Sequence, residues 1–130
     1  RQDAEIKEKI NGLNVMIVED EITSDIFLTK ILEKNNHNVI HAETGEEAIE
    51  LCSANNDLDL ILMDIKMPVM DGYTATKKIR EFNPDIIIIT QTAFALQGDE
   101  EKAYAAGCNE YISKPIDEEE LNSKIEKYFL

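Results

Sequence analysis

The 130-residue sequence has no tryptophan, only three prolines and only two cysteines. The cysteines, Cys52 and Cys108, show neither CxxC nor Cys/His spacing, so we assign them no function. No apolar run approaches the roughly 20 residues that cross a bilayer, and the first ten residues, RQDAEIKEKI, are too charged for a secretory signal. We therefore expect a cytoplasmic chain that makes no membrane contact of its own.

Basic residues are also scarce, with 13 lysines and arginines against 27 acidic residues and a formal net charge of -14. A surface of this charge repels a phosphate backbone, which argues against a nucleic-acid partner. The hydrophobic content of 43% is sufficient for one packed core. We expect a single domain.

The chain starts with Arg1 rather than methionine and stops directly after a helical pattern, which we interpret as a piece of a longer protein. Residues 1–12 carry Ile6 and Ile10 at helical spacing but little else that is apolar. We interpret this segment as a linker or N-terminal extension and expect the domain at residues 13–130.

Short β-rich runs alternate with helical patterns along the chain, which is typical of parallel strands joined by right-handed crossovers. The predicted strands are residues 14–18, 38–42, 58–63, 86–90 and 110–113. The first, third and fourth (NVMIV, LDLILM and IIIIT) are almost continuously apolar, as central strands covered on both faces require. The other two are more mixed and should lie towards the edges.

Helical periodicity predicts helices over residues 23–34, 44–53, 72–83, 99–106 and from 117 onward. Thr44 with Glu47 forms a capping-box pattern, and Asp117 with Glu120 repeats the spacing. Pro84 ends the third helix, and Gly107 suits the left-handed cap of the fourth. The pattern is (βα)5.

Charged and polar residues follow four of these strands, where open α/β sheets bind their ligands. They are Glu19 and Asp20 after the first strand, Asp64 after the third, Thr92 after the fourth and Lys114 after the fifth. Three carboxylates at one edge repel each other unless a cation lies between them or their pKa values rise. Hard oxygen ligands at a hydrated edge favour Mg2+, and Mn2+ could substitute.

With a metal present, Asp64 can act as a nucleophile towards phosphorus, and Lys114 supplies a cation for the transferred group. Thr92 offers a hydroxyl donor, and the small Ala93 leaves the approach open. Each residue taken alone has an ordinary role in capping or ion pairing. Their collection at four strand ends favours the chemical interpretation.

Four segments together resemble the receiver domain of two-component response regulators. They are Glu19-Asp20 after VMIV, Asp64 in LILMDIKMPVMDG, Thr92-Ala93 after IIIITQ, and Lys114-Pro115 in YISKP. The resemblance covers residues 13–130 and implies a doubly wound, flavodoxin-like α/β fold. Its five-stranded parallel sheet would have the order 2-1-3-4-5, with helices on both faces.

The resemblance also implies roles for individual residues. Asp20 and Asp64 would bind the metal directly, Glu19 would act through water, and the Lys66 carbonyl would complete the protein ligands. Thr92 and Tyr111 would form the switch, and a cis peptide before Pro115 would aim Lys114 inward. The side chains of Lys66 and Phe94 would influence how long the acyl phosphate survives.

The implied function is a phosphorylation switch that takes a phosphoryl group from a phosphohistidine onto Asp64 and assists its own phosphorylation and dephosphorylation. The donor would be a histidine kinase domain or a histidine phosphotransfer protein. The change would reach the face formed by residues 99–106, 110–113 and the last helix, which could also support a homodimer.

The segments LILMDIKMPVMDGYTATKKIR and QTAFALQGDEEKAYAAGCNEYISKP are especially similar to receivers at the C-terminus of hybrid histidine kinases. Such a parent would be a histidine kinase whose cytoplasmic part carries this domain, even if the parent is membrane-anchored. A stand-alone or truncated response regulator is the alternative.

Three other functions fit the sequence less well. A flavodoxin-like FMN protein needs a Gly/Ser/Thr-rich loop where this chain has the acidic EDEITSD. A magnesium phosphatase with an aspartyl nucleophile would place a second acid where Lys66 stands. His37 and His41 are alternative phosphoacceptors, but they fall at a turn and on a predicted edge strand.

Overall fold

The computed structural model describes residues 10–93 and 98–130. Strands and helices alternate along this part of the chain. The strands are β1 (Asn14–Val18), β2 (Asn38–Ala42), β3 (Leu60–Asp64), β4 (Ile87–Thr92) and β5 (Glu110–Ser113). The helices are α2 (Ile22–Lys34), α3 (Gly45–Ala54), α4 (Gly72–Phe82), α5 (Asp99–Ala106) and α6 (Glu118–Phe129).

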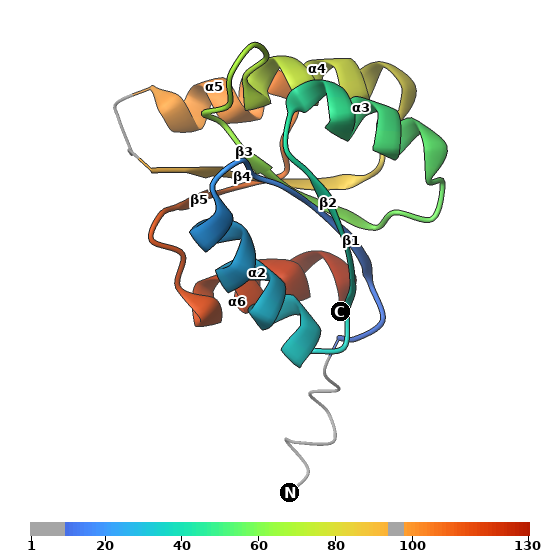
Figure 1. The fold of residues 1–130 in the computed structure, drawn as a ribbon, viewed down its shortest axis with the longest axis vertical. Coiled ribbons are helices and arrows are strands. Elements are labelled where there is room, and N and C mark those ends of the chain that lie inside the picture. Colours follow the sequence, from blue (N-terminus) through green and yellow to red (C-terminus); the bar gives the residue numbers. More distant parts are fainter. Residues whose placement is uncertain (1–9, 94–97) are drawn as a thin grey trace, which may run out of the picture.

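The five strands form one parallel sheet in the order β2-β1-β3-β4-β5. Helices α2 and α6 cover one face of the sheet, and α3, α4 and α5 cover the other (Figure 1). The predicted fold and strand order are confirmed, and the two mixed strands β2 and β5 lie at the edges as expected.

Each face of the sheet packs into its own hydrophobic core. One core cluster contains residues from α3, α4 and α5 with alternate residues of the strands, and the other contains residues from α2 and α6 with the intervening ones. The side chains of β3 are buried along its whole length. Since successive side chains of a strand point to opposite faces, a continuously apolar strand satisfies both cores.

Two strand boundaries differ from the prediction in a way that matters for function. Strand β3 starts at Leu60 instead of 58 and includes Asp64, while β4 starts at Ile87 and runs through Thr92. The ladder continues to the pair Asp64–Gln91 because the Ile65 amide still donates to the Gln91 carbonyl at 3.0 Å. The last residues of β3 and β4, Asp64 and Thr92, are therefore polar and still belong to the sheet.

Side-chain caps mark where helices α2 and α3 begin. Helix α2 begins one residue before the prediction, since the Glu21 carboxylate accepts from the Ser24 amide. The Thr44 hydroxyl accepts from the Glu47 amide at 3.0 Å, whereas the Glu47 carboxylate accepts from the Glu43 amide and not from that of Thr44. These caps satisfy amides that would otherwise lack partners.

Two predictions concern residues that lie partly or wholly outside the described part of the chain. Most of the expected linker at residues 1–12, and Phe94, lie outside the described residues. In residues 10–93 and 98–130, no helix is both long and apolar enough to cross a membrane.

Candidate active site

Three carboxylates meet at the carboxyl edge of the sheet. Glu19 and Asp20 follow β1, Asp64 ends β3, and each offers an oxygen within 4.8 Å of the others. Glu19 and Asp64 are 2% and 4% exposed, whereas Asp20 is open to solvent. This arrangement surrounds a divalent cation with three carboxylates and leaves an open side for water, which fits Mg2+.

Lys114 lies directly after β5 and reaches back across β4 to the carboxylates. Its Nζ is 2.8 Å from a Glu19 oxygen and 3.4 Å from an Asp64 oxygen. Burial opposes the lysine's charge, but the hydrogen bond to Glu19 and the charge of Asp64 outweigh it, so the pKa of Lys114 is raised. The ammonium group is therefore held charged beside Asp64.

Asp64 is the most strongly perturbed carboxyl of the site. Burial, and then repulsion from Glu19, raise its pKa from 3.8 to about 6 although Lys114 acts in the opposite direction. One lysine does not balance the buried carboxylates, so the site has spare negative charge. Perturbed carboxyls of this kind are typical of functional sites, and a bound cation would relieve the repulsion.

The loop after β3 is fixed by a close approach of backbone to backbone. The Gly72 amide donates to the Ile65 carbonyl at 2.9 Å, and a Cβ at Gly72 would collide with the Asp64 carbonyl oxygen. Helix α4 can start against the end of β3 only because residue 72 has no side chain. Gly72 thus helps to place the Asp64 carboxyl.

The family model of the response regulator receiver domain matches residues 15–126, which is most of the chain and includes every residue of this site. The chain is a response regulator receiver domain. This assignment favours the receiver interpretation over the FMN-binding and phosphatase alternatives.

Two curated relatives show the contexts in which similar receivers occur. The chain is 38% identical over 119 residues to hybrid signal transduction histidine kinase M of Dictyostelium discoideum, covering 87% of this chain and 5% of the kinase. It is 37% identical over 117 residues to the polar-differentiation response regulator DivK of Brucella ovis, covering 88% of this chain and 94% of DivK. A receiver from a large hybrid kinase and a small separate regulator thus have nearly the same sequence identity to this chain.

Two solved structures resemble the receiver in fold and sequence. The receiver domain of sensor histidine kinase PA1611 from Pseudomonas aeruginosa, with magnesium in its active-site cleft, is 33% identical at a TM-score of 0.84, covering 91% of this chain and 98% of that one. The Ssk1 receiver of Saccharomyces cerevisiae, in complex with the histidine phosphotransfer protein Ypd1, is 32% identical at a TM-score of 0.86. The match covers 94% of this chain and 92% of that one.

Four predicted site residues of the receiver, Glu19, Asp20, Asp64 and Lys114, are brought together as described. Thr92 ends β4 next to them, and the peptide bond between Lys114 and Pro115 is cis. Lys66 is exposed in the loop that follows β3. The ligand role of its carbonyl stays a prediction.

Tyr111 lies on β5, half-buried against the core that α3, α4 and α5 share. It pairs in register with Thr90, so Thr92 lies on the same face two residues further along β4. The Tyr111 hydroxyl is buried without a hydrogen-bond partner among the described residues, and burial raises its pKa. The Tyr111 hydroxyl is therefore available for a hydrogen bond to a new partner.

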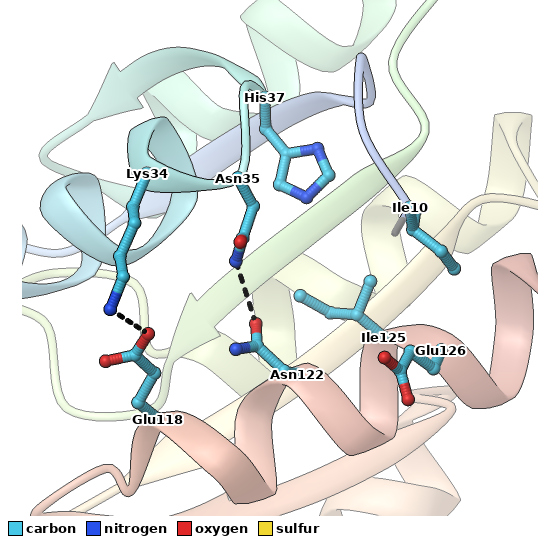
Figure 2. Close-up of a pocket in the computed structure, with 8 residues that line it drawn as sticks. All are labelled: Ile10, Lys34, Asn35, His37, Glu118, Asn122, Ile125 and Glu126. Atoms are coloured by element: carbon cyan, nitrogen blue, oxygen red, sulfur yellow. Dashed lines mark hydrogen bonds and ion pairs between the residues drawn. The ribbon is translucent and has the colours of Figure 1, made fainter. Parts of the chain in front are cut away.

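Neither histidine belongs to the acidic cluster among the described residues. His37 is at the amino edge of the sheet, where its Nδ1 accepts from the Leu13 amide at 3.2 Å, and it lines a cavity between α2 and α6 (Figure 2). His41 pairs with Asp25 at 2.9 Å on the β2 side. Neither histidine is placed to share the carboxylate site.

The sequence analysis overlooked Gln91, which lies beside Asp64. Gln91 is the register partner of Asp64 in the β3–β4 ladder and is 1% exposed. A glutamine within the run IIIITQT is an uncommon choice for a buried strand. That contrast with its neighbours was the available signal.

Proposed function

We propose that this receiver domain accepts a phosphoryl group from a phosphohistidine onto the carboxylate of Asp64 and signals through the resulting change. The observation that supports this most directly is the geometry around Asp64. A buried carboxyl with a raised pKa lies within the acidic cluster and 3.4 Å from a lysine ammonium. Such a group is nucleophilic when ionised, and an adjacent cation can stabilise the transferred charge.

In the transfer, an Asp64 oxygen forms a bond to phosphorus while the bond from phosphorus to the donor's imidazole nitrogen breaks. The imidazole leaves as a neutral base after taking up a proton. Lys114 exchanges its contact with Asp64 for a phosphoryl oxygen, and the Thr92 hydroxyl donates to another. Glu19 keeps Lys114 in place through the 2.8 Å ion pair.

Mg2+ would be held by Asp20 and Asp64, by Glu19 through water, and by the Lys66 carbonyl. The spare negative charge of the described carboxylates fits a divalent cation, and Mn2+ could replace it. A bound cation would neutralise the negative charge of the phosphoryl oxygens. The Mg2+-containing cleft of the PA1611 receiver supports the assignment.

The switch would pass from Thr92 to Tyr111. When Thr92 turns towards the phosphoryl group, it leaves space on the face of the sheet where Tyr111 lies. Tyr111 can then move inward and alter the surface formed by α5, β5 and α6. A homodimer through this surface stays a prediction.

We place the domain in the cytoplasm, as part of a hybrid histidine kinase. The Dictyostelium relative, of whose length this chain spans only a small fraction, supports that parent, while DivK supports a separate regulator as the alternative. The donor would accordingly be a kinase domain or a histidine phosphotransfer protein.

Incubation with acetyl phosphate and Mg2+ should add one base-labile phosphoryl group to the protein, as measured by intact mass. A chelator should prevent the gain. Lys114→Met should slow uptake by about 100-fold, the typical effect of removing one group that stabilises transition-state charge. Equal uptake by wild type and Lys114→Met would refute the role of the lysine, and no uptake by the folded wild type would refute the proposal.

A surface for the donor lies beside the site. Helix α2 begins directly after the acidic cluster, and its residues Ile22, Ile26 and Phe27 are 74%, 51% and 46% exposed. A protein that brings a phosphohistidine to Asp64 must cover this surface, and contiguous exposed apolar residues are typical of docking sites. We therefore propose that a histidine phosphotransfer protein docks on α2, a partner kind that the Ssk1–Ypd1 complex supports.

Ile26→Ser should slow phosphotransfer from a phosphorylated histidine phosphotransfer protein by about tenfold, because an apolar contact worth about 1.4 kcal/mol is lost. Uptake from acetyl phosphate should not change. Phe82→Ser is the matched control, since Phe82 is 46% exposed at the end of α4. If both variants slow transfer equally, α2 is not the docking surface.

A further inference from the structure

A second cleft lies next to the acidic cluster, between α2 and the connection from β5 to α6. Its volume is about 290 Å3, close to the lower end of the range for small-molecule sites, roughly 300 Å3. Its walls are mainly carbon. The lining residues are Thr23, Ser24, Phe27, Leu28, Gln91, Lys114, Pro115 and Ile116.

Gln91 is the polar exception among the buried residues of this cleft. It is 1% exposed, and neither its amide nitrogen nor its amide oxygen has a hydrogen-bond partner among the described residues. Leaving a buried donor and acceptor unpaired is costly, and native proteins rarely do so without a ligand or water. Gln91 therefore needs a partner that offers both an acceptor and a donor.

The strand register fixes the direction of the Gln91 side chain. Leu62 and Ile89, two residues before Asp64 and Gln91 on their strands, belong to the core under α2 and α6. Because side chains alternate along a strand, Gln91 also points to that face, on which the cleft opens. The amide atoms themselves are buried, so a partner from the cleft side pairs with them once the Gln91 side chain turns towards the cleft that it lines.

The cavity between α2 and α6, which His37 lines at the amino end of the sheet, provides a contrast (Figure 2). Four of its polar side chains already pair with each other: Lys34 contacts Glu118 at 3.0 Å, and the Asn35 side-chain nitrogen Nδ2 donates to the Asn122 side-chain oxygen Oδ1 at 3.3 Å. That cavity presents no comparable demand for a ligand. Of the two cavities, the one at Gln91 is therefore the one whose lining includes an unpaired amide.

We infer that this cleft binds a small, uncharged, largely apolar molecule that carries a lactam or carboxamide group, whose donor and acceptor pair with the Gln91 amide. Binding of an anion is disfavoured because Lys114, on the cleft wall, carries one positive charge against the two carboxylates of Glu19 and Asp64 that it contacts. Phe27 and Ile116 supply apolar contacts for the rest of the ligand.

Such a ligand would act on phosphorylation through the cleft wall. Lys114 and Pro115 line the cleft, and the Lys114 ammonium contacts both Glu19 and Asp64. Phe27 belongs both to the cleft and to the exposed surface of α2. A filled cleft therefore changes the environment of Lys114, which contacts the proposed phosphoacceptor Asp64, and of the proposed donor surface.

The test uses two rings of the same size, ε-caprolactam and cycloheptanone, in NMR titrations of the metal-free full chain. The lactam should shift the Gln91 side-chain amide and the Ile116 methyl signals saturably. The ketone lacks the donor and should bind about tenfold more weakly. Equal binding of the two, shifts centred on other residues, or no saturable shift would overturn the inference.

Gln91→Met should abolish the preference for the lactam over the ketone and should raise the melting temperature, because it removes an unpaired buried amide. Asn122→Ala, which removes an amide from the other cavity, should leave lactam affinity unchanged. An undiminished lactam preference in Gln91→Met would also overturn the inference. If that variant does not fold, the comparison in wild type still decides. No phosphodonor is used, so the outcome is independent of the proposed function.

Discussion

Asp64→Asn should make the metal-free protein more stable at pH 7.5, even though it removes the proposed phosphoacceptor. The folded state raises the pKa of Asp64 from 3.8 to about 6, so ionised Asp64 opposes folding above that pH. A shift of this size corresponds to a stabilisation on the order of 2–3 kcal/mol when the charge is removed. Urea unfolding measures it.

The pH dependence gives the sign of the effect. Below about pH 3, Asp64 is protonated in both the folded and the unfolded states, so the substitution should change little. Between pH 4 and 6 the folded state binds the proton more tightly, and the wild type should lose stability relative to Asp64→Asn as the pH rises. Above about pH 7, where Asp64 is ionised in both states, the difference should be constant.

Glu81→Gln is the matched control, since Glu81 is exposed on α4. It should change the free energy of unfolding by no more than about 0.5 kcal/mol, as is usual for surface positions. Mg2+ should stabilise wild type more than Asp64→Asn, because the substitution removes a proposed ligand. An Asp64→Asn protein less stable than wild type at pH 7.5 would show that Lys114 outweighs the repulsion.

Gly72→Ala should destabilise the domain by about 3 kcal/mol or more and impair phosphoryl uptake. The new Cβ would collide with the Asp64 carbonyl oxygen and lie 2.9 Å from the Ile65 Cα. Both are backbone atoms of the chain at the end of β3, so no side-chain rotation relieves the clash. Either the start of α4 or Asp64 must move.

Gly12→Ala separates this clash from ordinary backbone strain. Gly12 has a φ of +74° and no atom within 4 Å of an added Cβ, so alanine there should cost about 1 kcal/mol of strain. Urea unfolding of both variants, followed by phosphoryl uptake at a temperature where each is folded, measures the two effects. Similar stability losses in the two variants would contradict the close approach at Gly72.

The fold could be predicted because its strongest determinant is local. Three continuously apolar strands between helical patterns require a parallel sheet covered on both faces, with the two mixed strands at its edges. The order of the strands was implied by the resemblance to receivers and not by this pattern. The ends of β3 and β4 could not be predicted as well. Whether Asp64 and Gln91 still pair depends on the neighbouring strand, which the periodicity of one segment does not contain.

The site was predictable where residue type alone was unusual. Acids at the ends of buried strands, and one lysine after another strand, were visible in the sequence. The direct ion pair between Glu19 and Lys114 was not, because it depends on the reach of the lysine across β4. Similarly, the MDG segment shows a glycine at 72, but only the packing of α4 on β3 shows why it is needed.

The most direct test of the account is to locate the phosphoryl group chemically. The protein phosphorylated by acetyl phosphate and Mg2+ is treated with sodium borohydride, which reduces an aspartyl phosphate to homoserine and releases phosphate, and its peptides are then sequenced by mass spectrometry. The account predicts homoserine at position 64 alone. Homoserine at another acidic residue, or phosphate that resists reduction and maps to His37 or His41, would contradict it.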